Sequence, residues 1–215
     1  MRRSVPARPA DCLNLTLMKR PLSAAALGAI ALCAALSVMP RHAQAEGDDT
    51  PLINLVALAS KRLALAVPVA QWKWANGRAI TDPPREAALL ADVDKRARAA
   101  GVDPAFAHAF FQDQIEASKQ IQTALFDRWK TTKPPEGPAP DLAATTRPAL
   151  DQLTQALIPA LARAQPLRDS ADCPTRLKRS VENWKAMTHY ESGETAALTT
   201  ALAHVCSSGG MGGTG

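Results

Sequence analysis

Apolar residues recur along most of the chain at three- and four-residue spacings and nowhere alternate with a period of two. Aromatic residues make up only 4% of the sequence, β-branched residues are also sparse, and Ala and Leu recur throughout. This pattern is typical of amphipathic α-helices and argues against strands. The sequence therefore predicts an all-α fold.

Proline and glycine residues divide the chain into six expected helices. Pro68 is a candidate kink inside the first helix and Gly77 a stop for it, whereas Asp82 and Asp103 precede prolines and can cap the helices that follow. The proline-rich stretch 133–140 is expected to be a linker, because its composition does not suit a helix. We expect helices over 51–76, 83–100, 104–130, 143–165, 174–188 and 192–205.

The first 45 residues have the features of a secretory signal peptide. Lys19 and Arg20 precede an apolar run of 18 residues over 22–39, and Ala43 and Ala45 supply the small residues of a cleavage site. We expect cleavage after Ala45, which leaves a helical domain over 46–206 and a flexible, glycine-rich tail over 207–215. The alternative is that the apolar run remains as an uncleaved membrane anchor.

Charge is distributed unevenly between this leader and the rest of the chain. The chain has a formal net charge of +5 at pH 7, and all of it lies in residues 1–45, so the remaining residues are neutral overall. Nucleic-acid binding depends on phosphate neutralisation, and a neutral domain argues against it. We expect no later stretch to be apolar enough to span a membrane. We expect a periplasmic or secreted protein that binds neither nucleic acid nor, after cleavage, a membrane.

Two cysteines, Cys173 and Cys206, remain after the leader is removed. Export places them in an oxidising compartment, so we expect one disulfide between them. The histidines are scattered and no Cys-x-x-Cys motif is present, so the sequence offers no support for a metal site.

Two cations interrupt the apolar stripe of the first expected helix. Arg62 and Lys73 lie 11 residues apart, which is about three helical turns, so they point in the same direction. One explanation is that these long side chains extend from the edge of the stripe into solvent. The other is that they face a ligand.

The third expected helix has a similar anomaly. Ser118 and Gln122, spaced i, i+4, lie within the stripe formed by apolar residues such as Phe111 and Trp129. Buried polar groups cost stability unless they are paired. They therefore need a partner, which is either a neighbouring helix or a ligand.

Two further arginines stand at helix starts. Arg85 follows Asp82 in the first turn, where free backbone donors and an arginine together suit an anion, although pairing with Glu86 or Asp82 is the alternative. Arg147 follows the proline-rich linker. These cations and neutral donors suit a small polyanionic ligand, but by themselves do not separate an enzyme from a binding protein.

The spacing of these positions is distinctive. Arg62 is followed by Lys73 after 11 residues and by Asp82 after nine more, then by Arg85-Glu86 and later by Ser118 and Gln122. This combination resembles the active-site signature of the all-helical (AroQ-class) chorismate mutases. The leader, the segment Trp72-Lys73-Trp74 and the two cysteines resemble the secreted (gamma) subclass. The resemblance covers nearly all of residues 50–206 and implies the six-helix bundle of that family.

What the resemblance implies is an isomerase that converts chorismate to prephenate by a Claisen rearrangement, without a cofactor or metal. By similarity, Arg62, Arg85 and Arg147 hold the two substrate carboxylates. Lys73 and Gln122 donate hydrogen bonds to the ether oxygen, which gains negative charge as its bond to carbon breaks.

The remaining contacts also follow from the resemblance. Glu86 and the backbone around Asp82 bind the ring hydroxyl, and Ser118 helps to bind one of the substrate carboxylates. In cytoplasmic relatives one arginine comes from the partner subunit, and Arg147 is the candidate that completes the site within this chain. A homodimer is usual among relatives.

The site also departs from the secreted pattern. Secreted relatives can carry glutamate where this chain has Gln122 and glutamine where it has Leu89. The alternative function is a non-catalytic exported helical protein that binds a small dicarboxylate or a protein partner.

Overall fold

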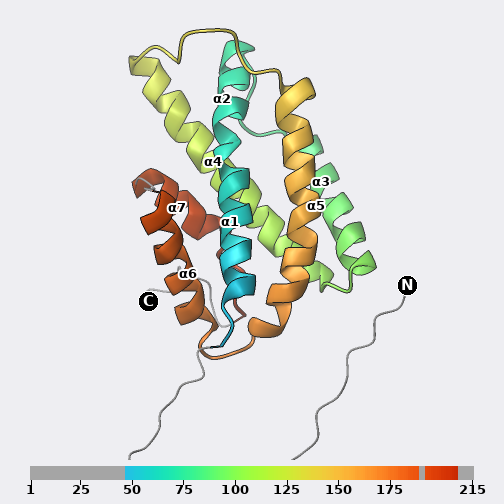
Figure 1. Ribbon diagram of the computed structural model, residues 1–215. Coiled ribbons are helices and arrows are strands. Elements are labelled where there is room, and N and C mark those ends of the chain that lie inside the picture. The colour runs from blue at the N-terminus through green and yellow to red at the C-terminus, as the bar shows by residue number, and fades with distance from the viewer. Residues whose placement is uncertain (1–46, 189–191, 208–215) are drawn as a thin grey trace, which may run out of the picture. The chain divides into compact units, whose positions relative to one another are not determined.

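The computed structural model describes residues 47–188 and 192–207, and within them the chain is helical with no strand (Figure 1). The expected signal peptide, His189 and tail residues 208–215 lie outside these ranges. The helices are α1 (Thr50–Ala64), α2 (Ala66–Ala75), α3 (Pro83–Ala99), α4 (Pro104–Thr131), the π-helical turn η1 (Leu142–Thr146), α5 (Arg147–Ala164), the 3-10 turn η2 (Gln165–Leu167), α6 (Cys173–Thr188) and α7 (Ser192–Ala201). Since α1 and α2 form one bent helix, the prediction of six helices in an all-α fold is confirmed.

The bend between α1 and α2 lies at Leu65, three residues before the expected kink at Pro68. Pro68 has no N–H and its ring crowds the carbonyl of the preceding turn, so the break occurs there. The Leu65 N–H donates to the Arg62 carbonyl at 3.2 Å in a tightened turn.

The starts of α3 and α4 match the expected caps. The Asp82 carboxylate accepts from the Arg85 N–H, and the Asp103 carboxylate accepts from the Ala105 N–H at 2.9 Å. A proline in the first turn of each helix has no N–H to leave unsatisfied.

Two helix boundaries differ from the expected ones. The fourth expected helix begins as the π-helical turn η1, capped by Asp141, and becomes α-helical only at Arg147. The last helix, α7, ends at Ala201 rather than at residue 205, because α4 supplies partners for its terminal backbone groups. Gln114 donates to the Ala201 carbonyl at 2.8 Å, and Asp113 accepts from the His204 N–H at 2.9 Å.

Helix α1 packs against α4, α5, α6 and α7 and occupies the middle of the bundle (Figure 1). Its Leu52, Leu55 and Val56 are fully buried and pack in one core with the α4 phenylalanines. The bent helix Thr50–Ala75 is long and apolar enough to cross a membrane, with a mean hydropathy of 1.6. The expectation that no segment after the leader is this apolar was therefore wrong. The buried apolar residues of α1 pack in the core of the bundle.

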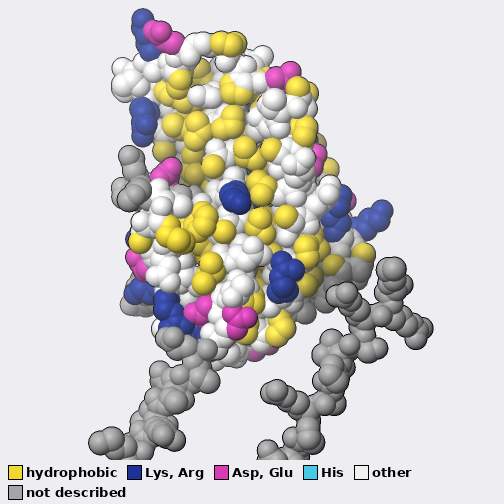
Figure 2. Space-filling model, in the orientation of Figure 1, with side chains coloured by type: hydrophobic (Ala, Val, Ile, Leu, Met, Phe, Trp, Pro, Cys, Tyr) yellow, Lys and Arg dark blue, Asp and Glu magenta, His cyan; other side chains and the backbone are white. Residues whose placement is uncertain are grey.

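Apolar side chains also reach the surface. Figure 2 shows many of them on the face viewed in Figure 1, with charged side chains mostly towards the margins. Ile53 on α1 and Val67 on α2 are 39% and 38% exposed. The described part of the chain thus has a partly apolar surface beside its central helix.

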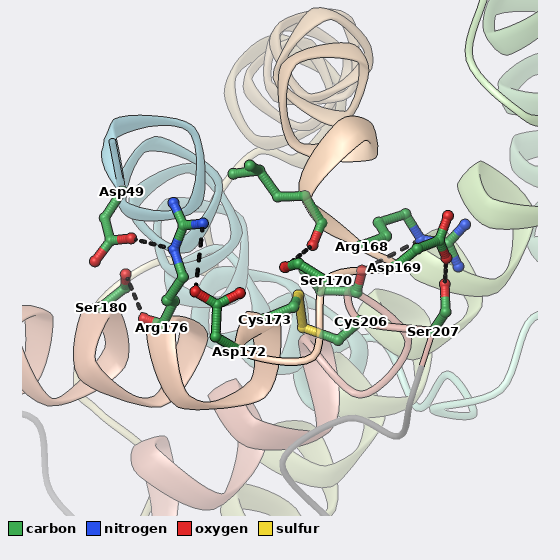
Figure 3. The surroundings of a disulfide bond; sticks show 12 residues. Asp49, Arg168, Asp169, Ser170, Asp172, Cys173, Arg176, Ser180, Cys206 and Ser207 are labelled. Carbon is green, nitrogen blue, oxygen red and sulfur yellow. Dashed lines mark hydrogen bonds and ion pairs between the residues drawn. A yellow bond between two sulfur atoms is a disulfide. The ribbon is translucent and has the colours of Figure 1, made fainter. Parts of the chain in front are cut away.

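The predicted disulfide between Cys173 and Cys206 is confirmed. It joins the first residue of α6 to the segment after α7, with a Cα–Cα distance of 5.9 Å (Figure 3). Nearby, Arg176 binds the Asp49 carboxylate and the Ser207 hydroxyl donates to Asp169. These contacts hold the start of α1 and the end of the described chain against α6 and its preceding loop.

Reduction of the disulfide is expected to lower the melting temperature without abolishing activity at room temperature. The bond closes a loop with a sequence separation of 33 residues, so its loss costs about 3 to 4 kcal/mol of unfolding free energy in the chain-entropy model. For a domain of this size the melting temperature falls by about 10 °C. Thermal melts and activity assays with and without reductant measure both effects, and two free thiols by mass spectrometry in the exported protein would contradict the assignment.

Candidate active site

A pocket of about 490 Å³ lies among the bent helix α1–α2, α3, α4 and the start of α5. Its walls contain every substrate-binding residue expected from the sequence, although these residues come from five helices and the N-cap position of α3. The residues are Arg62, Lys73, Asp82, Arg85, Glu86, Ser118, Gln122 and Arg147.

The pocket is strongly basic. Six of its lining residues are Lys or Arg and only two are acidic, which are Asp82 and Glu86. Low-dielectric walls of one sign concentrate ligands of the opposite sign. The pocket therefore favours a small anion that carries more than one negative charge.

Arg62 is the most deeply buried of these cations. Its side chain is 7% exposed, its guanidinium carbon lies 5.8 Å from the centre of the Phe111 ring, and its Nε has no hydrogen-bond partner. Burial, together with the positive charge of Arg85, lowers the pKa of Arg62 to about 10. A buried cation without a counter-ion destabilises the fold, so its position on the pocket wall favours an anionic ligand.

Lys73 occupies the α2 side of the pocket and is half-buried. Its ammonium donates to the Ile80 carbonyl, which fastens the loop between α2 and α3 over the pocket. Burial lowers the pKa of Lys73, the carboxylates of Asp82 and Glu86 oppose this shift, and Lys119 and Arg85 add to it. The ammonium keeps two further N–H groups for a ligand.

Ser118 and Gln122 face the pocket from α4, as their spacing predicts. The Gln122 amide nitrogen donates to the Ser118 hydroxyl at 3.0 Å, so these side chains pair within one helix rather than across two. Gln122 is 4% exposed and its amide oxygen has no partner. Because an amide nitrogen carries two N–H groups, one remains for a ligand.

The first turn of α3 supplies the acidic side of the pocket. The Asp82 N–H donates to Glu86 Oε1 at 3.1 Å, and Glu86 Oε2 forms an ion pair with Lys119 at 2.8 Å. Glu86 thus pairs with Lys119, whereas Arg85 is exposed and lines the pocket. This disfavours the alternative in which Arg85 is a surface residue paired with Glu86. Arg147, the first residue of α5, is also exposed and adds a cation to the rim.

Sequence reasoning missed two of the six cations. Lys119 shares the face of α4 on which Ile115, Ser118 and Gln122 lie, so its i, i+3, i+4, i+7 position was a signal that could have identified it. Arg78 belongs to the loop between α2 and α3, for which helical periodicity gives no information. Leu89, noted as a departure from the secreted pattern, also lines the pocket.

The arrangement suits binding and polarisation rather than metal chemistry. Among the residues that the structure describes, no group of three or more His, Cys, Asp or Glu side chains is placed to hold a metal ion. The pocket can hold carboxylates, donate hydrogen bonds to a developing negative charge and accept one from a hydroxyl.

Comparison with known proteins gives consistent matches. Residues 53–123 match the family described as chorismate mutase type II. Two curated relatives are named secreted chorismate mutase. The one from Mycolicibacterium smegmatis is 36% identical over 158 residues, which cover 73% of this chain and 86% of the relative. The one from Mycobacterium tuberculosis is 34% identical over 170 residues, covering 78% and 83% respectively.

Solved structures agree with these matches. A crystal structure of chorismate mutase from Burkholderia thailandensis is 68% identical, with a TM-score of 0.72, and the match covers 73% of this chain and 99% of that one. The chorismate mutase from Burkholderia phymatum is 32% identical, with a TM-score of 0.70 and coverage of 74% and 97%. Both the sequence and the fold show that this chain belongs to the chorismate mutase type II family.

Proposed function

We propose that this protein converts chorismate to prephenate and that the pocket described above is where the reaction occurs. The observation that carries the proposal is the buried guanidinium of Arg62, which has no partner at Nε and stands in a pocket with six cations and two carboxylates. Chorismate carries two carboxylates, so its charge fits this surplus. Family membership identifies the reaction class.

In this proposal, Arg62, Arg85 and Arg147 bind the two substrate carboxylates. Each projects from a different helix, so together they hold a flexible substrate in one conformation. Charge-assisted hydrogen bonds to carboxylates are roughly twice as strong as neutral ones. The Ser118 hydroxyl adds a neutral contact to a carboxylate.

The reacting centre lies between α2 and α4. Lys73 and Gln122 donate to the ether oxygen, on which negative charge grows as the carbon–oxygen bond breaks and a new carbon–carbon bond forms within the same molecule. Glu86 and the backbone around Asp82 engage the ring hydroxyl. Donors on rigid helices need little rearrangement when charge develops, which makes electrostatic stabilisation effective. A millionfold acceleration requires about 8 kcal/mol of stabilisation.

The direct test is to incubate the purified protein, cleaved after Ala45, with chorismate and to follow the loss of its ultraviolet absorbance. Turnover to prephenate supports the enzyme. A folded protein that binds a dicarboxylate but gives no turnover would instead support the alternative, a non-catalytic exported binding protein.

Arg62 offers a test that separates activity from stability. Arg62→Ala and Arg85→Ala should each lose about 10- to 100-fold in kcat/KM, because each removes a charge-assisted contact to substrate.

Arg62→Met should lose activity similarly, yet raise the free energy of unfolding by about 1 kcal/mol, because it removes a buried cation that the free protein leaves without a counter-ion. Steady-state kinetics and denaturant melts measure the two quantities. Wild-type kinetics in the arginine variants would show that the carboxylate anchors are misassigned.

The pH profile should have an alkaline limb to which Lys73 and Arg62, whose pKa values are both lowered, contribute. Burial lowers the pKa of Lys73 from its ordinary value of 10.5, and the ammonium is needed in its charged form. Activity is therefore present below this lowered pKa and is lost as the pH rises through it. A kcat/KM profile measured up to pH 11 checks this, and a flat profile throughout would show that the Lys73 charge is not used.

Export and assembly belong to the same proposal. The signal-like segment 1–45 and the relatives named as secreted support export, and the oxidising periplasm is the compartment in which the disulfide would form. A homodimer is expected from the resemblance to relatives, and the pocket, whose lining residues all belong to one chain, would be complete in each subunit. Light scattering of the purified protein tests the assembly, and a monomeric mass would contradict it.

A further inference from the structure

Lys119 forms an ion pair with Glu86, one of the two acidic residues of the pocket. On α4 it lies between Ser118 and Gln122 along the pocket wall, and its ammonium forms the 2.8 Å ion pair with Glu86 of α3. We propose that Lys119 is a positioning residue for the rearrangement. It holds the Glu86 carboxylate in the orientation in which that carboxylate accepts a hydrogen bond from the ring hydroxyl of the substrate. This inference rests on the proposed function.

The pair differs from an ordinary surface salt bridge. Both side chains are 24% exposed and they join two helices, whereas Lys130 and Asp127 pair within one turn of α4 at 66% and 61% exposure. Exposed pairs of the second kind contribute little to stability or orientation. The ion pair between α3 and α4 therefore restricts Glu86 more than solvent-exposed contacts would.

The geometry leaves Glu86 free for one more contact. One of its oxygens accepts from the Asp82 N–H at 3.1 Å and the other from Lys119 at 2.8 Å. A carboxylate has about four acceptor sites, so a substrate hydroxyl can still donate to it. Two fixed contacts on two different oxygens determine the plane of the carboxylate, and hence the direction from which the hydroxyl must approach.

Lys119 also pairs with a carboxylate, Glu86, whose charge acts on Lys73 as well. Without the Lys119 ammonium, the Glu86 carboxylate could pair with Lys73 instead, which would draw the Lys73 ammonium away from the ether oxygen. The other charged groups that line the pocket around Lys73 are Asp82 and Arg85 of α3, Arg62 of α1, Arg147 of α5 and Arg78 of the loop.

The test compares Lys119→Met, Lys119→Arg and the matched control Lys130→Met, which removes an exposed ion pair from the same helix. We expect Lys119→Met to lose about tenfold in kcat/KM, a coupling within the range of contacting residues. Lys119→Arg should recover most of this loss, and Lys130→Met should match the wild type. Thermal melts of every variant establish that each is folded.

Two further readouts separate positioning from general support of the fold. In Lys119→Met, the alkaline limb of kcat/KM should move to higher pH, because Lys73 loses a neighbouring cation and gains an unpaired carboxylate. In a Glu86→Gln background, Lys119→Met should cause no further loss, because Lys119 acts through Glu86.

Three results would overturn the inference while leaving the proposed function intact. These are wild-type kcat/KM in Lys119→Met, an unmoved alkaline limb, and an undiminished loss in the Glu86→Gln background, which would mean that Lys119 contacts the substrate itself. Absence of chorismate turnover by the wild-type protein would overturn the proposed function, and the inference with it.

Discussion

Lys73→Ala is expected to lower kcat by about 10² to 10³-fold, with a smaller change in KM. The Lys73 ammonium donates to an oxygen whose negative charge exists mainly in the transition state, and a contact made there affects kcat rather than ground-state binding. Its half-buried position among low-dielectric walls strengthens the interaction. Steady-state kinetics with chorismate measure both constants.

The matched control is Lys61→Ala, which removes an exposed lysine from the preceding helix. It should leave both constants unchanged. Because Lys73 also fastens the loop through the Ile80 carbonyl, Lys73→Arg is a second comparison that keeps the charge. If Lys73→Ala raised KM alone, with kcat unchanged, Lys73 would bind the substrate without stabilising the breaking bond.

Much of the fold follows from local sequence signals. The caps Asp82 and Asp103, each followed by proline, place the starts of α3 and α4 correctly, because capping depends only on neighbouring residues. The end of α7 could not be placed in this way. It is set by Gln114 and Asp113, which lie more than 80 residues away in the sequence and reach it only in the folded bundle.

The site residues also divide into those that local sequence signals identify and those whose contacts depend on helix packing. Arg62, Ser118 and Gln122 were identifiable because each breaks an apolar helical stripe that periodicity reveals. That Glu86 pairs with Lys119 could not be derived, because the choice among Arg85, Lys73 and Lys119 as its partner depends on how α3 packs against α4. Arg78 was missed because loops carry no such period.

Replacement of Gln122 should have an effect as large as that of Lys73, and one that depends on pH. Gln122→Ala should lose about 10² to 10³-fold in kcat at every pH, as for other preorganised donors to an oxyanion. Gln122→Glu should be poorly active at neutral pH, because an ionised carboxylate cannot donate and repels the charge that forms on the ether oxygen. Its protonated form can donate, so activity should return as the pH falls.

The pH at which activity returns depends on opposing effects. A glutamate has a pKa of about 4.3 when unperturbed. Burial at this position, where Gln122 is 4% exposed, would raise that value, and the nearby Lys73 ammonium would lower it. The wild-type amide does not titrate, so Gln122 contributes no pH dependence of its own between about pH 5 and pH 8.

The most direct measurement of the central claim, that this pocket rearranges chorismate by donating to its ether oxygen, is the kcat/KM profile of wild type and Gln122→Glu from pH 5 to pH 8. The account predicts an active wild type with little change across this range and a variant whose activity rises as the pH falls. Superimposed profiles, or a wild type that does not consume chorismate, would contradict it.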